Sequence, residues 1–510
     1  MTLKLKKLIC LGLVAAMTVT CFSACKRTPS GGGSTGLEEM DTTTKMTLSY
    51  MYWDDDGGVL GKELAKSFTE KYPNITVEVI PTTTADVNQQ ISDMHAASNT
   101  PDAFWYVNEI DTPIYNAYWT DMTQYFENDP ENDNIIKGIK EYKIGYFGTD
   151  YKWATPIKFF PQVAWVNKQF FEDNSLDMPN TEWTWEEFED VIEKSTMGGA
   201  NGRYGQKQSF GLTAAGGSYP VTWYPFAADD ACIGEFGWDG SQYNMDNWAD
   251  GLNLQRDYLA KNWLIDESGN MPFTNLPANL EAVYGEQVYA QDAGYVAIRA
   301  DKWWCWHSFW NNPDQGFIAN KVIFVPYIQP HLSTTEGKTN VCVYDMGGIS
   351  QWTDHPREAY ELLKYMTWGA DGWLKKMELY STYETDEMPN ATLRTYQIDV
   401  PITLDEEVWE KFRALEWYPQ EGDEYGREEY FTKFFDLVKE KYWAGLGATQ
   451  IPGFSTWLDT AYHGEVLIET QVLYEGGDAH EMVDELEKTG LEYYNERHDQ
   501  IMDYLKMIGK

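Results

Sequence analysis

The chain has 510 residues, of which 23% are charged and 43% hydrophobic, a composition typical of a folded protein with more than one domain. Its formal net charge of -41 argues against nucleic acid and anionic membranes as partners, since both are bound through basic patches. The simplest role of such a charge is solubility. Aromatic residues make up 15% of the chain, an excess that indicates flat side chains which stack on a ligand as well as core packing.

The first 24 residues have the pattern of a targeting segment. A basic start, MTLKLKK, precedes an apolar stretch that ends in FSAC, with small residues before Cys25. This pattern resembles a bacterial lipoprotein signal, which is cut before a cysteine that then carries lipid, although Phe22 replaces the usual leucine. An ordinary secretory signal or an uncleaved anchor is the alternative. The next stretch, KRTPSGGGSTG, is typical of a flexible tether. We therefore predict a signal peptide over 1–24 and a lipid-anchored tether over 25–44.

The rest of the chain offers neither a membrane span nor a disulfide framework. No later segment holds 18 uninterrupted apolar residues, so we expect no other spanning helix. Besides Cys25, the mature chain has Cys232, Cys305 and Cys342, which form at most one intramolecular pair. We expect each of the three to be a small buried residue rather than a reactive one.

Strand and helix patterns alternate from residue 45 onward. The expected elements are strands over 45–53, 75–81 and 101–107 and helices over 61–72 and 86–98. This alternation predicts a mostly parallel sheet with helices on both faces, and ligands of such sheets bind beyond the carboxyl ends of the strands. Trp53 lies at one such end, and Tyr106 and Glu109 lie at another.

The middle of the chain continues as a mixture of strands and helices. Residues 151–171 read as a strand, a turn and a second strand, and Thr184 with Glu187 forms a capping box that opens a helix. The later expected elements are strands over 294–306, 321–330 and 343–352, an amphipathic helix over 356–368, and a mostly helical C-terminal third that includes 430–446 and 480–509.

Five short signatures occur in a fixed order between about residues 45 and 370. They are TLSYMYW with KSFTEKYPNITVEV, the turn NTPDAFWYV, ATPIKFFPQVAWVNKQFF with TWEEF, VAIRADKWW, and MGGISQWTDHPREAYELLKYM. In this order they resemble the bacterial extracellular solute-binding proteins that deliver sugars to ABC importers, the maltose-binding-like group. The C-terminal third matches this family more loosely.

The resemblance implies an α/β fold of two lobes, periplasmic-binding-protein-like, with a hinge and a ligand cleft between lobes that are discontinuous in sequence. The lobes are then 45–156 with about 346–400, and 157–345 with about 401–510. It also implies a monomer that is not an enzyme, has no cofactor, and works with importer transmembrane subunits at the extracellular face of the bacterial membrane.

We predict ligand contacts at thirteen positions, Asp54 and Asp55 from the chemistry of the acidic turn after Trp53 and the others from the resemblance. They are Trp53, Asp54, Asp55, Tyr106, Glu109, Phe160, Tyr219, Trp223, Trp303, Trp304, Gly347, Gly348 and Trp457. Phe160 stands where related proteins often have a polar contact, so it is expected to be an apolar platform instead. Gly347 and Gly348 would let the backbone approach the ligand closely.

The chemistry of these residues suits a sugar. A sugar ring has a C–H face that aromatic rings cover and a rim of hydroxyls that carboxylates and amides bind. Trp53 is then a stacking platform, and Asp54 or Asp55 takes hydroxyls. Alternatively, the aspartates only form the turn and cap the next helix, and the tryptophans only pack the core. Several candidate platforms favour an oligosaccharide over a monosaccharide.

Other functions remain open at this stage. A secreted glycoside hydrolase would share the acidic, aromatic-rich composition, but it needs two carboxylates about 5–10 Å apart, and pairs such as Asp229 and Asp230 do not distinguish the two functions. A peptide or polyamine receptor of the same fold and a surface protein that binds glycan without transport are further alternatives. A metal receptor is disfavoured because the seven histidines show no metal-binding spacing.

Overall fold

The computed structural model describes a large part of the chain. The described residues are 37–53, 59–82, 87–106, 112–141, 151–197, 210–214, 220–231, 234–265, 290, 294–306, 322–382, 399–446, 450–462 and 468–510. The chain divides into one unit over 1–38 and a second over 39–510, and every element below belongs to the second unit. Among the described residues, no helix has the length and apolar character needed to cross a membrane.

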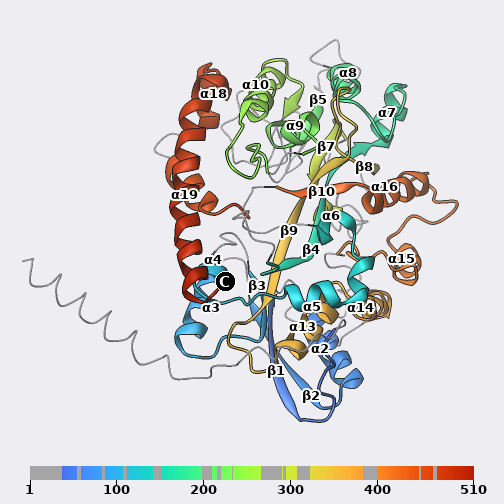
Figure 1. Ribbon diagram of the computed structural model, residues 1–510. Coiled ribbons are helices and arrows are strands. Elements are labelled where there is room, and N and C mark those ends of the chain that lie inside the picture. The colour runs from blue at the N-terminus through green and yellow to red at the C-terminus, as the bar shows by residue number, and fades with distance from the viewer. Residues whose placement is uncertain are drawn as a thin grey trace, which may run out of the picture. The chain divides into compact units, whose positions relative to one another are not determined.

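The structure alternates strands with helices, as the sequence predicts (Figure 1). The strands are β1 Met46–Trp53, β2 Ile75–Thr82, β3 Ala103–Tyr106, β4 Thr155–Asn167, β5 Phe210–Ala214, β6 Leu264–Ile265, β7 Val296–Lys302, β8 Phe324–Tyr327, β9 Thr339–Ile349 and β10 Tyr442–Gly445. The helices are α2 Val59–Lys71, α3 Val87–Ala96, α4 Thr112–Tyr115, α5 Thr123–Asn128, α6 Lys137–Lys140, α7 Lys168–Asn174, α8 Trp185–Ser195, α9 Pro220–Ala228, α10 Asp246–Ala260, α13 Pro356–Thr367, α14 Ala370–Thr382, α15 Glu406–Arg413, α16 Glu428–Glu440, α17 Phe454–Trp457, α18 Ile468–Glu475 and α19 Val483–Met507.

The strands form one hydrogen-bonded sheet in the order β2-β1-β3-β9-β4-β7-β5-β6, with β10 paired to β9 and β8 paired to β4. The group β1–β3 is parallel, and so is the group β5–β7. The two central strands run antiparallel to their neighbours in this order. The expected parallel sheet is therefore correct for each group and wrong for the strands that join them.

Strand β4 is one continuous strand where the sequence analysis expected two strands and a turn. Its first half, Thr155 to Pro161, pairs with β9, and its second half, from Gln162 onward, pairs with β7 and β8. The proline lacks a backbone N–H, but it stands where the strand exchanges one set of partners for another, so it does not interrupt a long ladder. Figure 1 shows β4 and β9 running side by side between the two parallel groups.

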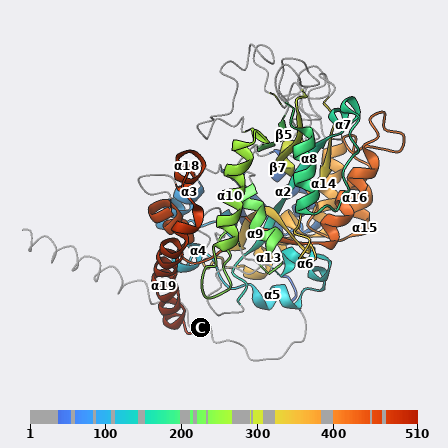
Figure 2. The same ribbon diagram turned by 90° about the horizontal axis from the view of Figure 1, so that it is seen from above.

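The capping box predicted at Thr184 is confirmed. The Thr184 side chain accepts from the Glu187 backbone N–H, and the Glu187 carboxylate accepts from the Thr184 backbone N–H. This reciprocal pair fixes the start of α8. Helices α8, α9 and α10 gather around β5–β7 (Figure 2), and their apolar faces share a core with the C-terminal helices.

That core explains why the C-terminal third belongs to the fold of the middle segment. Trp248 on α10, Phe236, and Trp457 on α17 are buried together. Gly490 on α19 lets the helix approach closely, since a Cβ there would lie 2.8 Å from the Tyr243 ring. Further along α19, Arg497 lies over the Tyr115 ring of α4, the helix that follows β3, at 5.1 Å.

One helical prediction needs correction. The helix expected over 430–446 ends at Glu440, and β10 follows, because its backbone pairs with the first residues of β9. The amphipathic helix expected over 356–368 is present as α13, and residues 357–367 are all buried, so its polar side is covered as well. Its charged residues are held by partners: Lys364 Nζ lies 2.9 Å from Asp129 Oδ2. Burial alone would lower the pKa of Lys364, but Glu361 and neighbouring carboxylates outweigh burial and raise it.

Two of the three cysteines behave as predicted. Cys305 and Cys342 are free and buried, and burial raises the pKa of both thiols well above the ordinary value. They are therefore protonated small core residues rather than nucleophiles. Cys232 lies outside the described residues.

Candidate functional site

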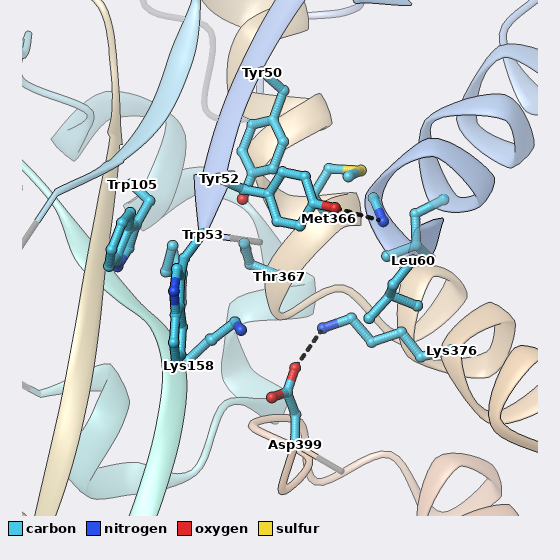
Figure 3. Close-up of a pocket in the computed structure, with 13 residues that line it drawn as sticks. Tyr50, Tyr52, Trp53, Leu60, Trp105, Lys158, Met366, Thr367, Lys376 and Asp399 are labelled. Atoms are coloured by element: carbon cyan, nitrogen blue, oxygen red, sulfur yellow. Dashed lines mark hydrogen bonds and ion pairs between the residues drawn. The ribbon is translucent and has the colours of Figure 1, made fainter. Parts of the chain in front are cut away.

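Trp53 ends β1 with a partly buried indole that contacts two residues from other strands. Its ring stacks on Trp105 of β3, with centroids 6.0 Å apart and planes inclined by 19°. The ammonium of Lys158, on β4, lies 4.7 Å from the Trp53 ring centroid. Figure 3 shows Trp105 on one side of the indole and the Lys158 ammonium on the other. Trp53 is thus an aromatic side chain at a strand end. One side of its ring packs against Trp105, and a cation lies over the other.

A cavity of about 40 Å³ adjoins this indole. It is lined by residues of β1, α2, β3, β4, α13 and α14 and by Asp399, which precedes α15. The lining residues are Tyr50, Tyr52, Trp53, Leu60, Gly61, Leu64, Trp105, Ile157, Lys158, Met366, Thr367, Lys376 and Asp399. The Tyr52 hydroxyl accepts the Gly61 N–H at 3.2 Å. A Cβ on Gly61 would lie 2.3 Å from the Tyr52 ring, so only glycine lets this wall close.

The cavity contains a buried ion pair. Lys376 is 4% exposed, and its Nζ lies 3.6 Å from Asp399 Oδ2. Burial lowers the pKa of Lys376 despite the opposing effect of Asp399, and the positive charge of Lys158 lowers it further. The two ammonium groups therefore repel each other across the cavity.

Strand β4 connects this region to a second aromatic surface. Lys158, Phe160 and Gln162 alternate along the strand and so share one face. Phe160 packs its ring against Trp304, with centroids 5.3 Å apart and planes at 71°. Gln162 accepts the indole N–H of Trp223 through Oε1. Three alternate residues of one strand thus contact three of the tryptophans that the sequence analysis selected.

Polar groups accompany Trp304 as well. Lys302 lies opposite Gln162 in the sheet, and its ammonium lies 5.4 Å from the Trp304 ring centroid. Burial lowers the pKa of Lys302. The Gln162 Nε2 group is buried and finds no hydrogen-bond partner among the described residues. Aromatic rings with amide and ammonium donors are the combination that recognises a sugar face and its hydroxyls.

Two carboxylates lie in the same neighbourhood. Tyr462 donates its hydroxyl to Glu469 Oε1 at 2.6 Å. Burial raises the pKa of Glu235 to about 7, the charge of Glu469 adds to this effect, and Lys302 opposes it. At neutral pH Glu235 is therefore partly protonated and able to donate a hydrogen bond. Within the described residues, no three His, Cys, Asp or Glu side chains gather in a way that could hold a metal ion.

Glu235 is expected to make stability fall as pH rises. Its pKa is raised from 4.5 to about 7 in the folded protein, so between these values the folded state binds a proton that the unfolded state has lost. The contribution of this group to the free energy of unfolding is largest below pH 4.5 and is lost as the pH rises to about 7. The Glu235→Gln variant removes this decline. The difference in free energy of unfolding, variant minus wild type, should therefore be more positive at pH 8 than at pH 5.

Urea unfolding of both proteins at the two pH values measures this difference. Glu78→Gln, which changes an exposed glutamate of β2, is the matched control. Its difference from wild type in free energy of unfolding should be the same at both pH values. A Glu235→Gln difference that does not change with pH would contradict the role assigned to burial.

Several selected aromatic residues are buried. Trp303 is 1% exposed and stacks with Trp165 at 5.7 Å on the face of β4 opposite to Phe160. It also packs against residues of α16 such as Phe435, at 5.0 Å. Trp457 is fully buried in the core with Phe236. Phe160 and Trp223 are each 1% exposed as well, so Phe160 is not the open apolar platform that the sequence analysis expected. These placements favour core packing for all four residues, whereas Trp53 and Trp304 are partly accessible.

Packing against neighbouring protein atoms accounts for Tyr106, Gly347 and Gly348. Tyr106 is 3% exposed and meets the Trp119 ring edge-on, with centroids 6.0 Å apart. A Cβ on Gly347 would lie 2.8 Å from Ile157 Cγ2, and one on Gly348 would lie 2.7 Å from a backbone oxygen. Neighbouring protein atoms therefore require both glycines, a reason that differs from the ligand approach expected from the sequence.

Five predicted positions lie outside the described residues: Cys25, Asp54, Asp55, Glu109 and Tyr219. Sequence reasoning did not select the polar residues Lys158, Gln162, Glu235, Lys302, Lys376, Asp399 and Glu469. The alternation with Phe160 in β4 could have indicated Lys158 and Gln162. The others come from distant segments and share no motif.

The sheet of two parallel groups, joined by β4 and β9, with aromatic and polar residues along the joining strand, is the arrangement expected of a solute-binding protein. The family model for bacterial extracellular solute-binding proteins matches residues 63–383, and the chain belongs to that family. This confirms the resemblance inferred from the five signatures.

Solved structures agree on the fold. The sugar-binding protein MalE from Xanthomonas citri has 13% identity and a TM-score of 0.60, with 89% of this chain and 98% of that chain covered. A sugar transporter from Rhizobium etli in an open conformation has 13% identity and a TM-score of 0.60, with 87% and 99% covered. A cyclic alpha-maltosyl-1,6-maltose binding protein from Arthrobacter globiformis has 10% identity and a TM-score of 0.57, with 88% and 99% covered.

These likenesses show a two-lobed α/β fold of the periplasmic-binding-protein type. A search of curated proteins finds no match to this chain. The family and the structural neighbours are binding proteins, and the family is extracellular.

Proposed function

We propose that this chain is the substrate-binding component of a carbohydrate ABC importer and that it captures an oligosaccharide without cleaving it. The observation that carries the proposal is the face of β4 that runs from Trp53, through Lys158 and Phe160, to Trp304. It joins an aromatic surface at the end of β1 to another just after β7. Two partly accessible aromatic surfaces, one beside each group of strands, suit several linked sugar rings better than one.

The solved neighbours support this ligand class. An ABC substrate-binding protein from Listeria monocytogenes, with 15% identity, a TM-score of 0.54, and 91% of this chain and 99% of that chain covered, was solved with cycloalternan. The lobes of this chain are then residues 45–156 with about 346–400, and residues 157–345 with about 401–510. The ligand binds between them and favours the closed state only by its higher affinity for that state.

The setting follows from the N-terminal sequence. Cys25 carries the lipid, and the tether over 25–44 holds a monomeric binding protein at the extracellular face of the membrane. There the closed form docks on the transmembrane subunits of the importer. The family's extracellular character and the small residues before Cys25 support this arrangement.

A thermal-shift screen of residues 37–510 tests the proposal. Plant and storage oligosaccharides form the panel, and peptides and polyamines serve as controls. A ligand that binds only the folded state raises the melting temperature by mass action. We expect one oligosaccharide series to raise it by several degrees and to be recovered uncut. A response to peptides or amines alone would identify another ligand class, and cleavage of the sugar would identify a hydrolase.

A further inference from the structure

Helix α19 belongs to the second of the proposed lobes and also contacts the first. Its 25 residues span roughly 37 Å, at about 1.5 Å per residue. Figure 1 shows the helix in red, with its last turns beside α4. Its buried residues are three, four or seven positions apart and so share one side of the helix; they are Val483, Leu486, Gly490, Tyr494, Ile501 and Leu505. One side of a single helix therefore contacts both lobes.

The first half of α19 is held by the core of the second lobe. Leu486 and Tyr494 are buried in the core that α10 and α17 share. The rings of Tyr494 and Trp238 pack together with centroids 4.5 Å apart. Glu487 accepts the backbone N–H of Met245 at 2.8 Å. Because these contacts are mostly apolar and buried, this half of the helix moves with the second lobe.

Residues at the other end of α19 contact the first lobe. The ammonium of Lys510, which follows the helix, lies 2.7 Å from Asp121 Oδ2. The same ammonium lies 4.7 Å from the ring centroid of Tyr151 and 4.9 Å from that of Trp153. All three partners come from the segment that follows α4 and precedes β4. A single lysine thus ties the end of α19 to one segment of the first lobe.

The two halves of the helix are held with different strength. Ile501 and Leu505 are buried, but neither belongs to the core that holds the first half. The pair of Lys510 and Asp121 is partly open to solvent, and the Tyr115 ring under Arg497 is exposed as well. Ion pairs that solvent reaches contribute little to stability. When one lobe rotates against the other, the second half of α19 is therefore the part that separates.

We propose that α19 is a strap that holds the two lobes in the arrangement seen here, and that its second half parts from the first lobe when the cleft closes on a ligand. In this arrangement the rings of Trp53 and Trp304 stay partly accessible, as the entry of a ligand requires. A contact made in only one arrangement shifts the equilibrium toward that arrangement. Loosening the strap should therefore favour the closed form and tighten binding. The inference rests on the proposed lobes of the proposed function.

The Lys510→Met variant loosens the strap without changing any candidate ligand contact. Methionine has a similar shape but lacks the charge that pairs with Asp121. Small-angle X-ray scattering without ligand should give a smaller radius of gyration for the variant than for wild type. Titration calorimetry with the oligosaccharide found in the thermal-shift screen should show that the variant binds about two- to fivefold more tightly.

Lys506→Met is the matched control, because Lys506 is exposed on the same half of α19 and pairs with Asp503 of the helix itself. It should leave the radius of gyration and the affinity unchanged. Arg497→Met, at the contact with Tyr115, should act in the same direction as Lys510→Met. If Lys510→Met changes neither quantity, or if it weakens binding, the inference is overturned. If no sugar binds, the proposed function fails, and the scattering comparison alone decides whether α19 is a strap.

Discussion

Replacement of Trp53 by alanine is expected to weaken oligosaccharide binding by more than about tenfold and to leave the protein folded. The indole is the accessible aromatic surface at the end of β1, and alanine offers a sugar ring no face to stack on. The stacked Trp105 and the Lys158 ammonium would also lose their contact with the ring. Titration calorimetry with the oligosaccharide found in the thermal-shift screen measures the loss.

The control is a tryptophan that lies on the surface. Trp352 is 62% exposed, and none of the site residues contacts its ring in the described structure; Trp352→Ala should bind the sugar as wild type does. Circular dichroism and the melting temperature establish that both variants are folded. Unchanged affinity in Trp53→Ala would remove Trp53 from the ligand site.

The adjacent residues Trp303 and Trp304 are expected to respond in opposite ways. Trp303 packs against Trp165, Trp306 and α16, so Trp303→Ala should lower the free energy of unfolding by about 3–5 kcal/mol. Trp304 is partly exposed and touches Phe160 at the ring edge. Trp304→Ala should therefore cost much less stability and weaken ligand binding instead.

Urea unfolding and calorimetry on the same two variants separate these effects. Each substitution removes the same side chain from adjacent positions, so each serves as the control for the other. If Trp304→Ala proves the more destabilising of the two, or if it binds sugar as tightly as wild type does, the assignment of Trp304 to the ligand surface is wrong.

The sequence predicts the elements whose signals are local. The alternating segments up to Tyr106 and the capping box at Thr184 are both found in the structure. Each depends on neighbours within a few residues, so periodicity and end signals were sufficient. The family follows from the order of such local segments.

Features that depend on residues far apart in the sequence could not be predicted from local patterns. Nothing local to Pro161 shows that β4 continues through it, because the exchange from β9 to β7 and β8 supplies the reason. The polar side of α13 is buried against residues far away in the sequence, such as Asp129, which accepts from Lys364 and lies over 200 residues before it. Trp303 and Trp304 look alike in the sequence, and only the two faces of β4 distinguish a core residue from a surface one.

The mode of pairing in β4 bears on how the two lobes can move. No unpaired linker interrupts this strand: its hydrogen bonds pass directly from β9 to β7 and β8. Rotation of one lobe against the other must then bend a strand that is hydrogen-bonded along its length. Bending strains these hydrogen bonds, so the strand favours a return to its unbent form. The ladder is irregular between Pro156 and Lys158, and a strand bends most easily at such a point. Lys158, whose ammonium lies over the Trp53 ring, stands at this point, so the candidate site and the place where the strand bends most easily share a residue.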